Sequence, residues 1–488
     1  MPLIAGVDSS TQSTKVVLCD SDTGRVLGTA SAPHPRTSPP LSEQHPSSWW
    51  EAMLKAWHAA LNAANADGAD VRAISVAAQC HGLVALDGSG SVIRPAKLWN
   101  DTTTAPEMEE LREAMPSSEW ARRIGSVPTA AFTVSKLLWF RTAEPENFKR
   151  LAQILLPHDW LTYKLTGQFA TDRSEASGTG YYSAEHGRYD HDILALVDEY
   201  TAWDRLLPRV VGPSETVGTV TASAAEALGV SQATIVGPGA GDQHASALGL
   251  GARRGDRVLS LGTSGVLFTV SEKPVHDDQG IVDGVADATG GYLPLVSTLN
   301  AARVTDAFAR ILGVDHQELS KMALSASPVD MPVLAAFLDG ERKPNLPHAT
   351  GTLAGIRTDI TRDQMARAAI EGVIFGLRRG AEHLDRVGAP SDGRIILTGG
   401  AARSEAYRQL TADAFDSVVH TSASLESVAV GAAIQASACL QGLSVQQLRD
   451  SWAPEPVFAA SPADAPSSNQ AFERYKAAAE WRGSDRLL

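Results

Sequence analysis

The sequence predicts an α/β protein made of two related domains, and three observations support this prediction. The chain of 488 residues exceeds what one hydrophobic core usually supports, so two domains of roughly 200 to 250 residues are expected. A strand, a turn rich in Gly, Ser and Thr, and a second strand occur at residues 3–18 and again at residues 257–270, which indicates a duplicated domain. Stretches of helical and of strand character alternate along the chain, which argues against an all-β fold.

The first hairpin places a carboxylate, several hydroxyls and one cation around its turn. Asp8 ends an apolar run, three hydroxyl residues follow it, and Lys15 begins the second strand. The turn of the second hairpin contains Gly262 and Thr263. Free backbone N–H groups and hydroxyls in such turns can surround a phosphate. Either hairpin alone is equally compatible with an ordinary β-turn, but two of them could hold one nucleotide.

The remaining elements follow from periodicity and from turn residues. Glycines and charges near residues 246–256 place the boundary between domains of residues 1–248 and 249–488. The expected elements are a helix over 49–63, a strand over 71–78, a helix over 363–387, a strand over 394–398, a glycine-containing turn over 399–404, a helix over 405–414, a Pro/Ala/Ser-rich surface segment over 453–470 and a short terminal helix over 471–481. The turn after the strand over 394–398 suits a nucleotide at a helix N-terminus, although glycine there is also plain turn chemistry.

Composition and absent motifs exclude several classes of function. The net charge of −14 disfavours binding to nucleic acid or to anionic membranes. No P-loop, Gly-x-Gly-x-x-Gly or His-Glu-x-x-His motif occurs. The three cysteines form no Cys-x-x-Cys pair, and no apolar run approaches the ~18 residues of a membrane span. We therefore expect a cytoplasmic protein that is neither exported nor anchored in a membrane.

Three short segments combine groups that suit a small polar ligand. An apolar strand ends in Gln79, Cys80 and His81, Trp99 stands beside an amide and a carboxylate, and Asp242 lies among small residues just before Gln243. A carboxylate in that setting can be approached by a substrate hydroxyl and could accept its proton. The plainer alternatives are a satisfied histidine beside a buried thiol, a core tryptophan and an Asx-turn. We expect His244 to be structural.

Together these segments resemble the FGGY carbohydrate kinases, over nearly the whole chain. The most specific matches are 132–139, 261–265 and a C-terminal signature over 351–371. Segments 79–82, 98–101 and 340–344 resemble the subgroup that phosphorylates D-xylulose. The resemblance implies two related actin-like (ribonuclease H-like) ATPase domains around a nucleotide and sugar cleft, with the sugar and the catalytic base held by the N-terminal domain and ATP by the C-terminal domain.

The resemblance also implies roles for individual residues. Asp242 would be the base on the attacked hydroxyl, and Asp8 would help to hold Mg²⁺ and the transferring phosphoryl group. The sugar-pocket residues would be Cys80, His81, Trp99 and Gln243. The ATP contacts would be Thr11, Lys15, Gly262, Thr263, Gly400 and Ser404.

The chain departs from the family at three positions, and other functions stay open. Ser10 and Ala401 stand where glycine is usual, and Cys80 stands where methionine is frequent, so the identity of the sugar is the implication most weakened. The alternatives are a kinase for another ketopentose, polyol or cyclitol, an actin- or chaperone-like ATPase that needs no sugar, and a catalytically silent sugar sensor. A homodimer is common among similar kinases.

Overall fold

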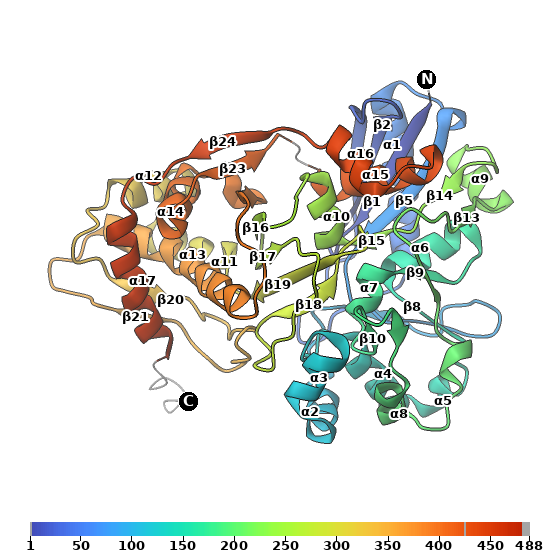
Figure 1. The fold of residues 1–488 in the computed structure, drawn as a ribbon, viewed down its shortest axis with the longest axis horizontal. Helices are drawn as coiled ribbons and strands as arrows, with labels where there is room; N and C mark the ends of the chain where they lie inside the picture. The colour runs from blue at the N-terminus through green and yellow to red at the C-terminus, as the bar shows by residue number, and fades with distance from the viewer. Residues whose placement is uncertain (1, 424–425, 481–488) are drawn as a thin grey trace. The chain divides into compact units, whose positions relative to one another are not determined.

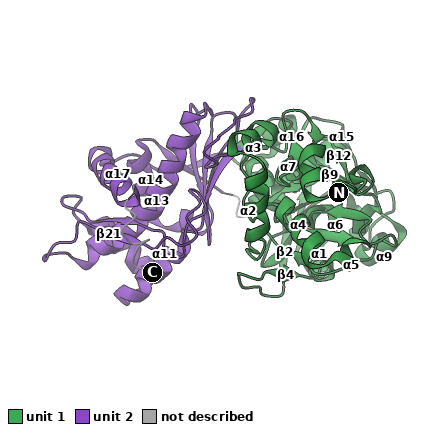
Figure 2. Ribbon diagram, turned by 90° about the horizontal axis from the view of Figure 1, so that it is seen from below, with its two compact units in different colours: residues 1–252, 284–293, 426–454 green, residues 253–283, 294–425, 455–488 purple. Residues whose placement is uncertain are grey.

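The computed structural model describes residues 2–423 and 426–480. Within it the chain forms two compact units, coloured separately in Figure 2. Unit 1 comprises residues 1–252, 284–293 and 426–454, and unit 2 comprises residues 253–283, 294–425 and 455–488. The first segment of unit 1 ends close to the boundary predicted at residue 248. The return of two later segments to unit 1 was not predicted, because nothing local in a sequence reports a long-range return of the chain.

Unit 1 is built on a mixed sheet whose central strand is fully buried. The sheet order is β13-β14-β5-β1-β2-β3, with β15 paired to β5 as well. The strands are β1 (Leu3–Ser9), β2 (Ser13–Asp20), β3 (Val26–Pro33), β5 (Val71–Ala78), β13 (Gly218–Thr219), β14 (Ile235–Val236) and β15 (Ala240–Gly241). All seven residues of β1 are buried, as expected of a strand covered on both faces.

Two helices distant in sequence cover the sheet of unit 1 (Figure 1). Helix α1 (Ser47–Ala64) packs on β2 and β3, and it buries Trp49 and Trp57. Helix α15 (Ser427–Gln441) packs on β1 and β5, and also on α10 (Asp242–Gly249). Small residues make the α10–α15 crossing close: a Cβ on Gly431 would overlap the carbonyl oxygen of Ala245. This crossing fixes the position of α10, which begins at Asp242.

Unit 2 repeats this plan. The second seven-stranded sheet runs β18-β19-β17-β16-β22-β23-β24, and all of its strands except β18 lie wholly or mainly in unit 2. The strands are β16 (Arg257–Leu261), β17 (Gly265–Thr269), β18 (Asp283–Ala286), β19 (Tyr292–Thr298), β22 (Ile395–Thr398), β23 (Val419–Ser422) and β24 (Pro456–Ala460). The long helix α13 (Arg362–Arg386) packs on β17, and α14 (Glu405–Phe415) packs on β23 and β24.

Six strands of one sheet match six strands of the other in order and in direction. In unit 1, β3, β2 and β1 are successively antiparallel, β1, β5 and β14 are parallel, and β13 is antiparallel to β14. In unit 2, the series β19, β17, β16, β22, β23, β24 has the same directions in the same order. The predicted duplication and the α/β class are therefore confirmed, and both hairpins lie at equivalent places.

The other elements surround these two sheets. The remaining helices of unit 1 are α2 (Ala105–Ala114), α3 (Ser117–Ile124), α4 (Thr133–Ala143), α5 (Pro145–Phe148), α6 (Pro157–Thr166), α7 (Arg173–Ser177), α8 (His191–Val197), α9 (Ala222–Leu228) and α16 (Val445–Trp452). Those of unit 2 are α11 (Ala302–Leu312), α12 (His316–Ser325) and α17 (Ala465–Glu480). Short paired strands are β4 (Glu43–Gln44) with β7 (Ala96–Lys97), β6 (Val84–Leu86) with β8 (Gln153–Leu155), β9 (Ala170–Asp172) with β12 (Arg209–Val211), β10 (Tyr182–Ser183) with β11 (Arg188–Tyr189), and β20 (Val333–Ala335) with β21 (Thr352–Ala354). Among the described residues, no helix is both long and apolar enough to cross a lipid bilayer.

The predicted elements agree with the structure except in the C-terminal tail. The helices expected over 49–63, 363–387 and 405–414 are α1, α13 and α14, and the strands over 71–78 and 394–398 are β5 and β22. The tail was predicted wrongly as a surface segment over 453–470. It contains β24, which extends the sheet, and α17, which begins at Ala465 because Asp464 accepts the N–H of Ser467 and Pro466 suits a first helical turn. The predicted end of that helix, Trp481, lies outside the described residues.

Candidate active site

The carboxyl ends of three strands in unit 1 bring the predicted sugar and catalytic residues to one edge of the sheet. Strands β1 and β5 are parallel and in register from Ile4 to Ser9, so the turn after Asp8 lies beside the segment that starts at Gln79. Strand β15 pairs in parallel with the last residues of β5, with Gly241 opposite Ala78. Asp242 therefore follows directly at the same edge, where ligands of open α/β sheets commonly bind.

Asp8 is a buried carboxylate with a raised pKa. Ser10 Oγ donates a hydrogen bond of 2.6 Å to Asp8 Oδ1. Burial raises the pKa of Asp8 to about 7, the Ser10 hydrogen bond and the charge of Lys15 lower it, and the charges of Asp242 and Glu426 add to the rise. Ser10 does not occupy the left-handed backbone region, so its departure from the family's glycine requires no strained conformation.

Asp242 begins helix α10 and lies against the thiol of Cys80. The backbone N–H of Gln243 donates to Asp242 Oδ1 at 2.7 Å, and Cys80 Sγ lies 3.7 Å from the same oxygen. Burial raises the pKa of Asp242, and these two donors oppose the rise. A carboxylate with a raised pKa is a better proton acceptor near neutral pH than an exposed one. The hydrogen bond with Gln243 goes to the next residue in the chain, so it is not the Asx-turn that was the plainer alternative for Asp242, because an Asx-turn reaches the N–H two residues on.

His81 is held in a strained backbone conformation by the segment that resembles the family signature. Its φ is +66°, a left-handed value that is uncommon for residues other than glycine. Its ring stacks on Phe132 at 4.8 Å between centroids, and its carbonyl accepts from Thr133 Oγ1. His81 Nδ1 lies 2.6 Å from the carbonyl oxygen of Gly178. Because a carbonyl only accepts, Nδ1 carries the proton and Nε2 is the acceptor nitrogen.

Trp99 joins the first turn through its indole N–H. Trp99 Nε1 donates to Thr11 Oγ1 at 2.9 Å, and Thr11 Oγ1 donates to Gln79 Oε1 at 3.1 Å. Thr11, which was assigned to ATP, thus contacts the predicted sugar residue Trp99 in this structure. Gln79 Nε2, Asn100 Oδ1 and Gln243 Oε1 are buried without a hydrogen-bond partner among the described residues. Buried polar atoms of this kind require an explanation, and the hydroxyls of a sugar would supply partners.

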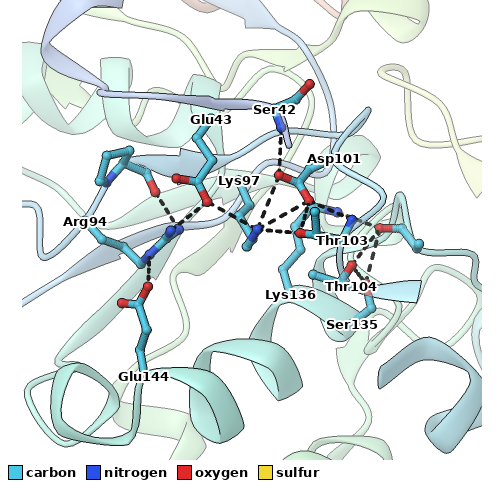
Figure 3. Close-up of polar contacts among 12 residues, drawn as sticks. Ser42, Glu43, Arg94, Lys97, Asp101, Thr103, Thr104, Ser135, Lys136 and Glu144 are labelled. Atoms are coloured by element: carbon cyan, nitrogen blue, oxygen red, sulfur yellow. Dashed lines mark hydrogen bonds and ion pairs between the residues drawn. The ribbon is translucent and has the colours of Figure 1, made fainter. Parts of the chain in front are cut away.

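A buried ionic network fixes the loop that carries Trp99 (Figure 3). Lys97 and Asp101, which flank Trp99, are 1% and 0% exposed and are joined by contacts of 3.3 Å. Lys97 Nζ also reaches Glu43 at 3.2 Å and lies over the ring of Trp139. Asp101 accepts the backbone N–H of Ser42 at 2.9 Å. The carboxylate of Asp101 is therefore a positioning group for the loop. Lys97 was not anticipated from the sequence, because its contacts with Glu43 and Trp139 join distant parts of the chain.

Lys15 forms its ion pair with Glu426 rather than with Asp8. Its ammonium group lies 2.8 Å from Glu426, and its side chain is 36% exposed. Burial opposes the charge of Lys15, but the bond to Glu426 raises its pKa overall. Glu426 was missed by the sequence analysis, since it lies more than 400 residues away in the chain. A phosphate at the first turn would compete with Glu426 for this cation.

The four predicted ATP residues of unit 2 gather at one edge of its own sheet. Strands β16 and β22 are parallel, and Ser260 is opposite Thr398, so the turns holding Gly262 and Gly400 lie side by side. Gly399, at φ +86°, abuts the carbonyl of Leu261 so closely that a Cβ would overlap it. Gly262 and Thr263 are exposed.

Ser404 is the N-cap of α14 and donates to Ser320 Oγ at 3.0 Å. The Ser404 hydroxyl therefore already caps α14 and contacts Ser320 of α12. Ala401, the third departure from the family pattern, lies in the turn between Gly399 and Ser404 and adopts no left-handed conformation, so alanine is accommodated without strain.

The sequence analysis also missed a cluster of buried polar residues beside Gly241, the residue that precedes Asp242. It contains Glu175 from α7, His158 from α6 and Asp172 at the N-cap of α7. His158 Nε2 lies 3.2 Å from Asp172 Oδ1, and although burial opposes the charge of His158, Asp159 and Asp172 raise its pKa to about 9. The only sequence signal was a set of acidic and histidine residues at 158–175 with no shared motif, and only the fold shows that they lie in one cluster.

Comparison with known proteins agrees with this geometry. The N-terminal domain of the FGGY family of carbohydrate kinases matches residues 3–249, and the C-terminal domain of that family matches residues 258–440. A xylulose kinase of Streptomyces rubiginosus is 42% identical over 442 residues, which cover 90% of this chain and 89% of that protein.

Solved structures of two kinases resemble the whole chain. The crystal structure of xylulose kinase from Bifidobacterium adolescentis is 36% identical, with a TM-score of 0.84 and coverage of 97% of this chain and 99% of that one. Glycerol kinase of Plasmodium falciparum, crystallised with ADP, is 19% identical, with a TM-score of 0.86 and coverage of 100% and 98%. At that identity the second likeness concerns the fold alone.

Proposed function

This chain belongs to the FGGY family of carbohydrate kinases, and we propose that its reaction is the ATP-dependent phosphorylation of D-xylulose to D-xylulose 5-phosphate. The observation that carries the proposal is the convergence of Asp8, Asp242 and the Cys80–His81 segment at one edge of the unit 1 sheet. The substrate class is supported by the xylulose kinases to which the chain is similar. An ATPase that acts on a protein partner has no need of the predicted sugar-binding residues Cys80, His81, Trp99 and Gln243.

In the proposed reaction, Asp242 accepts the proton of the attacked hydroxyl. The hydroxyl oxygen forms a bond to the γ-phosphorus of ATP, the bond from that phosphorus to the bridging oxygen breaks, and ADP leaves. Phosphoryl transfer depends mainly on alignment and on stabilisation of charge. The raised pKa of Asp242 and its fixed place at the start of α10 suit a base that has to be aligned with one hydroxyl.

The residues around Asp8 suit Mg²⁺, which we propose as the metal that accompanies ATP. Carboxylate oxygen is the donor type that Mg²⁺ prefers, and a desolvated carboxylate whose pKa lies at about 7 would be stabilised as an anion by a nearby cation. When bound with the nucleotide, this ion would neutralise charge on the transferring phosphate. Asp8 would hold it, assisted by the orienting hydrogen bond from Ser10.

We further propose that Cys80, His81, Trp99 and Gln243 line the sugar pocket, and that Thr11, Lys15, Gly262, Thr263, Gly400 and Ser404 contact ATP. The support for the first group is its shared edge of the sheet and the buried unpartnered atoms beside it. The support for the second is the equivalent position of the two hairpin turns in two matching sheets. The three free cysteines fit action in a reducing cytoplasm, and a homodimer stays a prediction.

The test is ADP release by the purified protein with Mg-ATP, alone and with a panel of ketopentoses, polyols and cyclitols. We expect strong stimulation by D-xylulose and a product phosphorylated at its terminal hydroxyl. Stimulation by another member of the panel alone would replace the substrate but keep the reaction. ATP hydrolysis that no sugar stimulates would overturn the proposal.

A further inference from the structure

Three side chains near the proposed catalytic base form a cluster in which only Cys80 has a proposed part in the kinase reaction. Cys80 follows β5, Glu175 lies in α7 and His244 lies in α10. The thiol, one carboxylate oxygen and one ring nitrogen all lie within 4.8 Å of one another. We call these three residues the thiol cluster.

The buried groups of the thiol cluster lack ordinary partners. Glu175 and His244 are 1% and 4% exposed. Neither oxygen of Glu175 and neither ring nitrogen of His244 has a hydrogen-bond partner among the described N–H and O–H groups. An unsatisfied buried polar group destabilises the folded protein, and such groups in a native protein often mark an ion or a water.

Gly241 leaves the space between these groups open. A Cβ on Gly241 would lie 2.6 Å from both Cys80 Sγ and His244 Nδ1, and closer still to Glu175 Oε1. Three potential ligand atoms therefore converge on one small region, and any side chain at position 241 would fill it. Cys80 is only partly buried, which gives the cluster a route to its surroundings.

From this convergence we propose that Cys80, Glu175 and His244 bind a thiophilic divalent cation, of which Zn²⁺ is the best fit, and that the bound ion inhibits the enzyme. One sulfur, one nitrogen and one oxygen ligand are a set that Zn²⁺ accepts in a tetrahedral site with a fourth position open. Mg²⁺ does not suit the set, because it prefers oxygen ligands in octahedral geometry.

The charge of the ion is matched by its ligands. Zinc is ligated by a thiolate, a carboxylate and a neutral imidazole. A thiol or carboxyl that carries a proton releases it to solvent as its bond to zinc forms, and His244 supplies a lone pair of one ring nitrogen. The two anionic ligands then neutralise the two charges of Zn²⁺.

Inhibition follows from the position of Cys80. Its thiol donates to Asp242 Oδ1 at 3.7 Å. A thiolate bound to the ion has no proton to donate, so the proposed base would lose one of the two donors that hold this oxygen, the other being the backbone N–H of Gln243.

The first measurement is metal binding itself, which does not depend on turnover. Co²⁺ is added to the metal-free full-length protein, and the absorption bands of tetrahedral Co²⁺ with a thiolate ligand are recorded. We expect such bands to saturate at one equivalent and to disappear when Zn²⁺ is added. Absence of a thiolate-to-cobalt band at millimolar Co²⁺ would overturn the proposal and leave the kinase function untouched.

Two variants assign the ligands. His244→Leu replaces the ring by an apolar side chain of similar volume. We expect this variant to lose the Co²⁺ bands and to be more than ~100-fold less sensitive to inhibition by buffered free Zn²⁺. Loss of a residue that only hydrogen-bonds to a metal ligand has a smaller effect. The activity of His244→Leu without zinc should stay within a few-fold of the parent. Cys439→Ser, which removes the other partly buried thiol, should keep both the bands and the inhibition.

Other outcomes decide against the site. Bands that persist in His244→Leu, or that vanish in Cys439→Ser, would place the metal elsewhere. If His244→Leu does not fold, Cys80→Met serves in its place for the binding measurement alone, and bands of unchanged intensity in that variant would exclude the thiol cluster.

Discussion

At the scale of single residues, burial gives the two key carboxylates their chemistry. Asp242 sits among small residues, where a raised pKa and a fixed start of α10 favour proton transfer. Asp8 is held at one oxygen by Ser10. Neither property is visible in the letters of the sequence, since both depend on which side chains exclude water around the carboxylate.

Asp242→Asn tests the base. The variant keeps the shape of the side chain but cannot accept a proton, so we expect turnover to fall on the order of a hundred- to ten-thousand-fold. ATP affinity, measured by calorimetry, and the melting temperature should stay near those of the parent. Near-normal turnover would remove Asp242 from the proton-transfer step.

Asp8→Asn tests the raised pKa through stability. The folded pKa of about 7 lies above the usual 3.8, so the folded protein binds more protons than the unfolded chain between these values and loses stability as pH rises through the window. The variant lacks this loss of stability. Measured without nucleotide and metal, its free energy of unfolding relative to that of the parent should rise by about 2 to 3 kcal/mol between pH 5 and pH 8, at ~1.4 kcal/mol per pH unit.

Urea unfolding at both pH values measures this difference. Asp22→Asn, at an exposed position after β2, controls for the loss of a negative charge. A difference between Asp8→Asn and the parent that is the same at pH 5 and pH 8 would contradict a pKa near 7.

At the scale of elements, the site is positioned by close contacts between pieces of backbone. Helix α10 carries Asp242 and crosses α15 at small residues, with Ser246 Oγ and Ser427 Oγ 3.0 Å apart. The Trp99 loop is fixed instead by the buried pair Lys97–Asp101. The first contact is steric and the second is ionic, and each holds a side chain that we propose to react with the substrate or to bind it.

Gly431→Ala tests the α10–α15 crossing. The added methyl group would overlap the carbonyl oxygen of Ala245, and backbone on both helices would have to move. We expect a loss of about 3 kcal/mol or more in the free energy of unfolding, with lower turnover because Asp242 shifts with α10.

Gly376→Ala is the matched control for that variant. It also adds a methyl group to a glycine inside a helix, α13, but its nearest contact is an ordinary one of 3.5 Å with the Tyr475 hydroxyl. Its stability should equal or exceed that of the parent, since alanine is favoured over glycine in helices. Equal effects of the two substitutions would show that the crossing is not close-packed.

At the scale of the whole molecule, two sheets of matching topology are completed by chain segments that return from far away. Unit 1 needs residues 426–454 because α15 covers β1 and β5, whose strands are buried on both faces. A chain that ends at Ala252 would expose the apolar residues of that face. Folding of unit 1 therefore depends on the C-terminal quarter of the sequence.

Truncation after Ala252 tests this dependence. We expect the fragment to show no cooperative thermal transition and no near-ultraviolet circular dichroism typical of packed aromatic residues. The same fragment fused through a flexible linker to residues 426–454 should regain both signals. Cooperative unfolding of the unfused fragment would contradict the role of α15.

Local sequence patterns were sufficient to predict the α/β class, the duplication, the strong helices and the strand ends that carry Asp8, Cys80, His81 and Asp242. These depend on periodicities and turn residues that lie within a few positions of one another. Composition misled only where a Pro- and Ser-rich stretch, 453–470, forms β24 and the start of α17.

Tertiary structure alone decided what surrounds those residues. Glu426 lies beside Lys15, Glu175 beside Gly241, and Lys97 over the ring of Trp139, and each of these pairs joins distant parts of the chain. Their effects on charge and on packing act through space at a few ångströms, and sequence separation carries no information about that distance. The physical reason is that pKa values and close contacts depend on the final fold, whereas helices, strands and turns are specified locally.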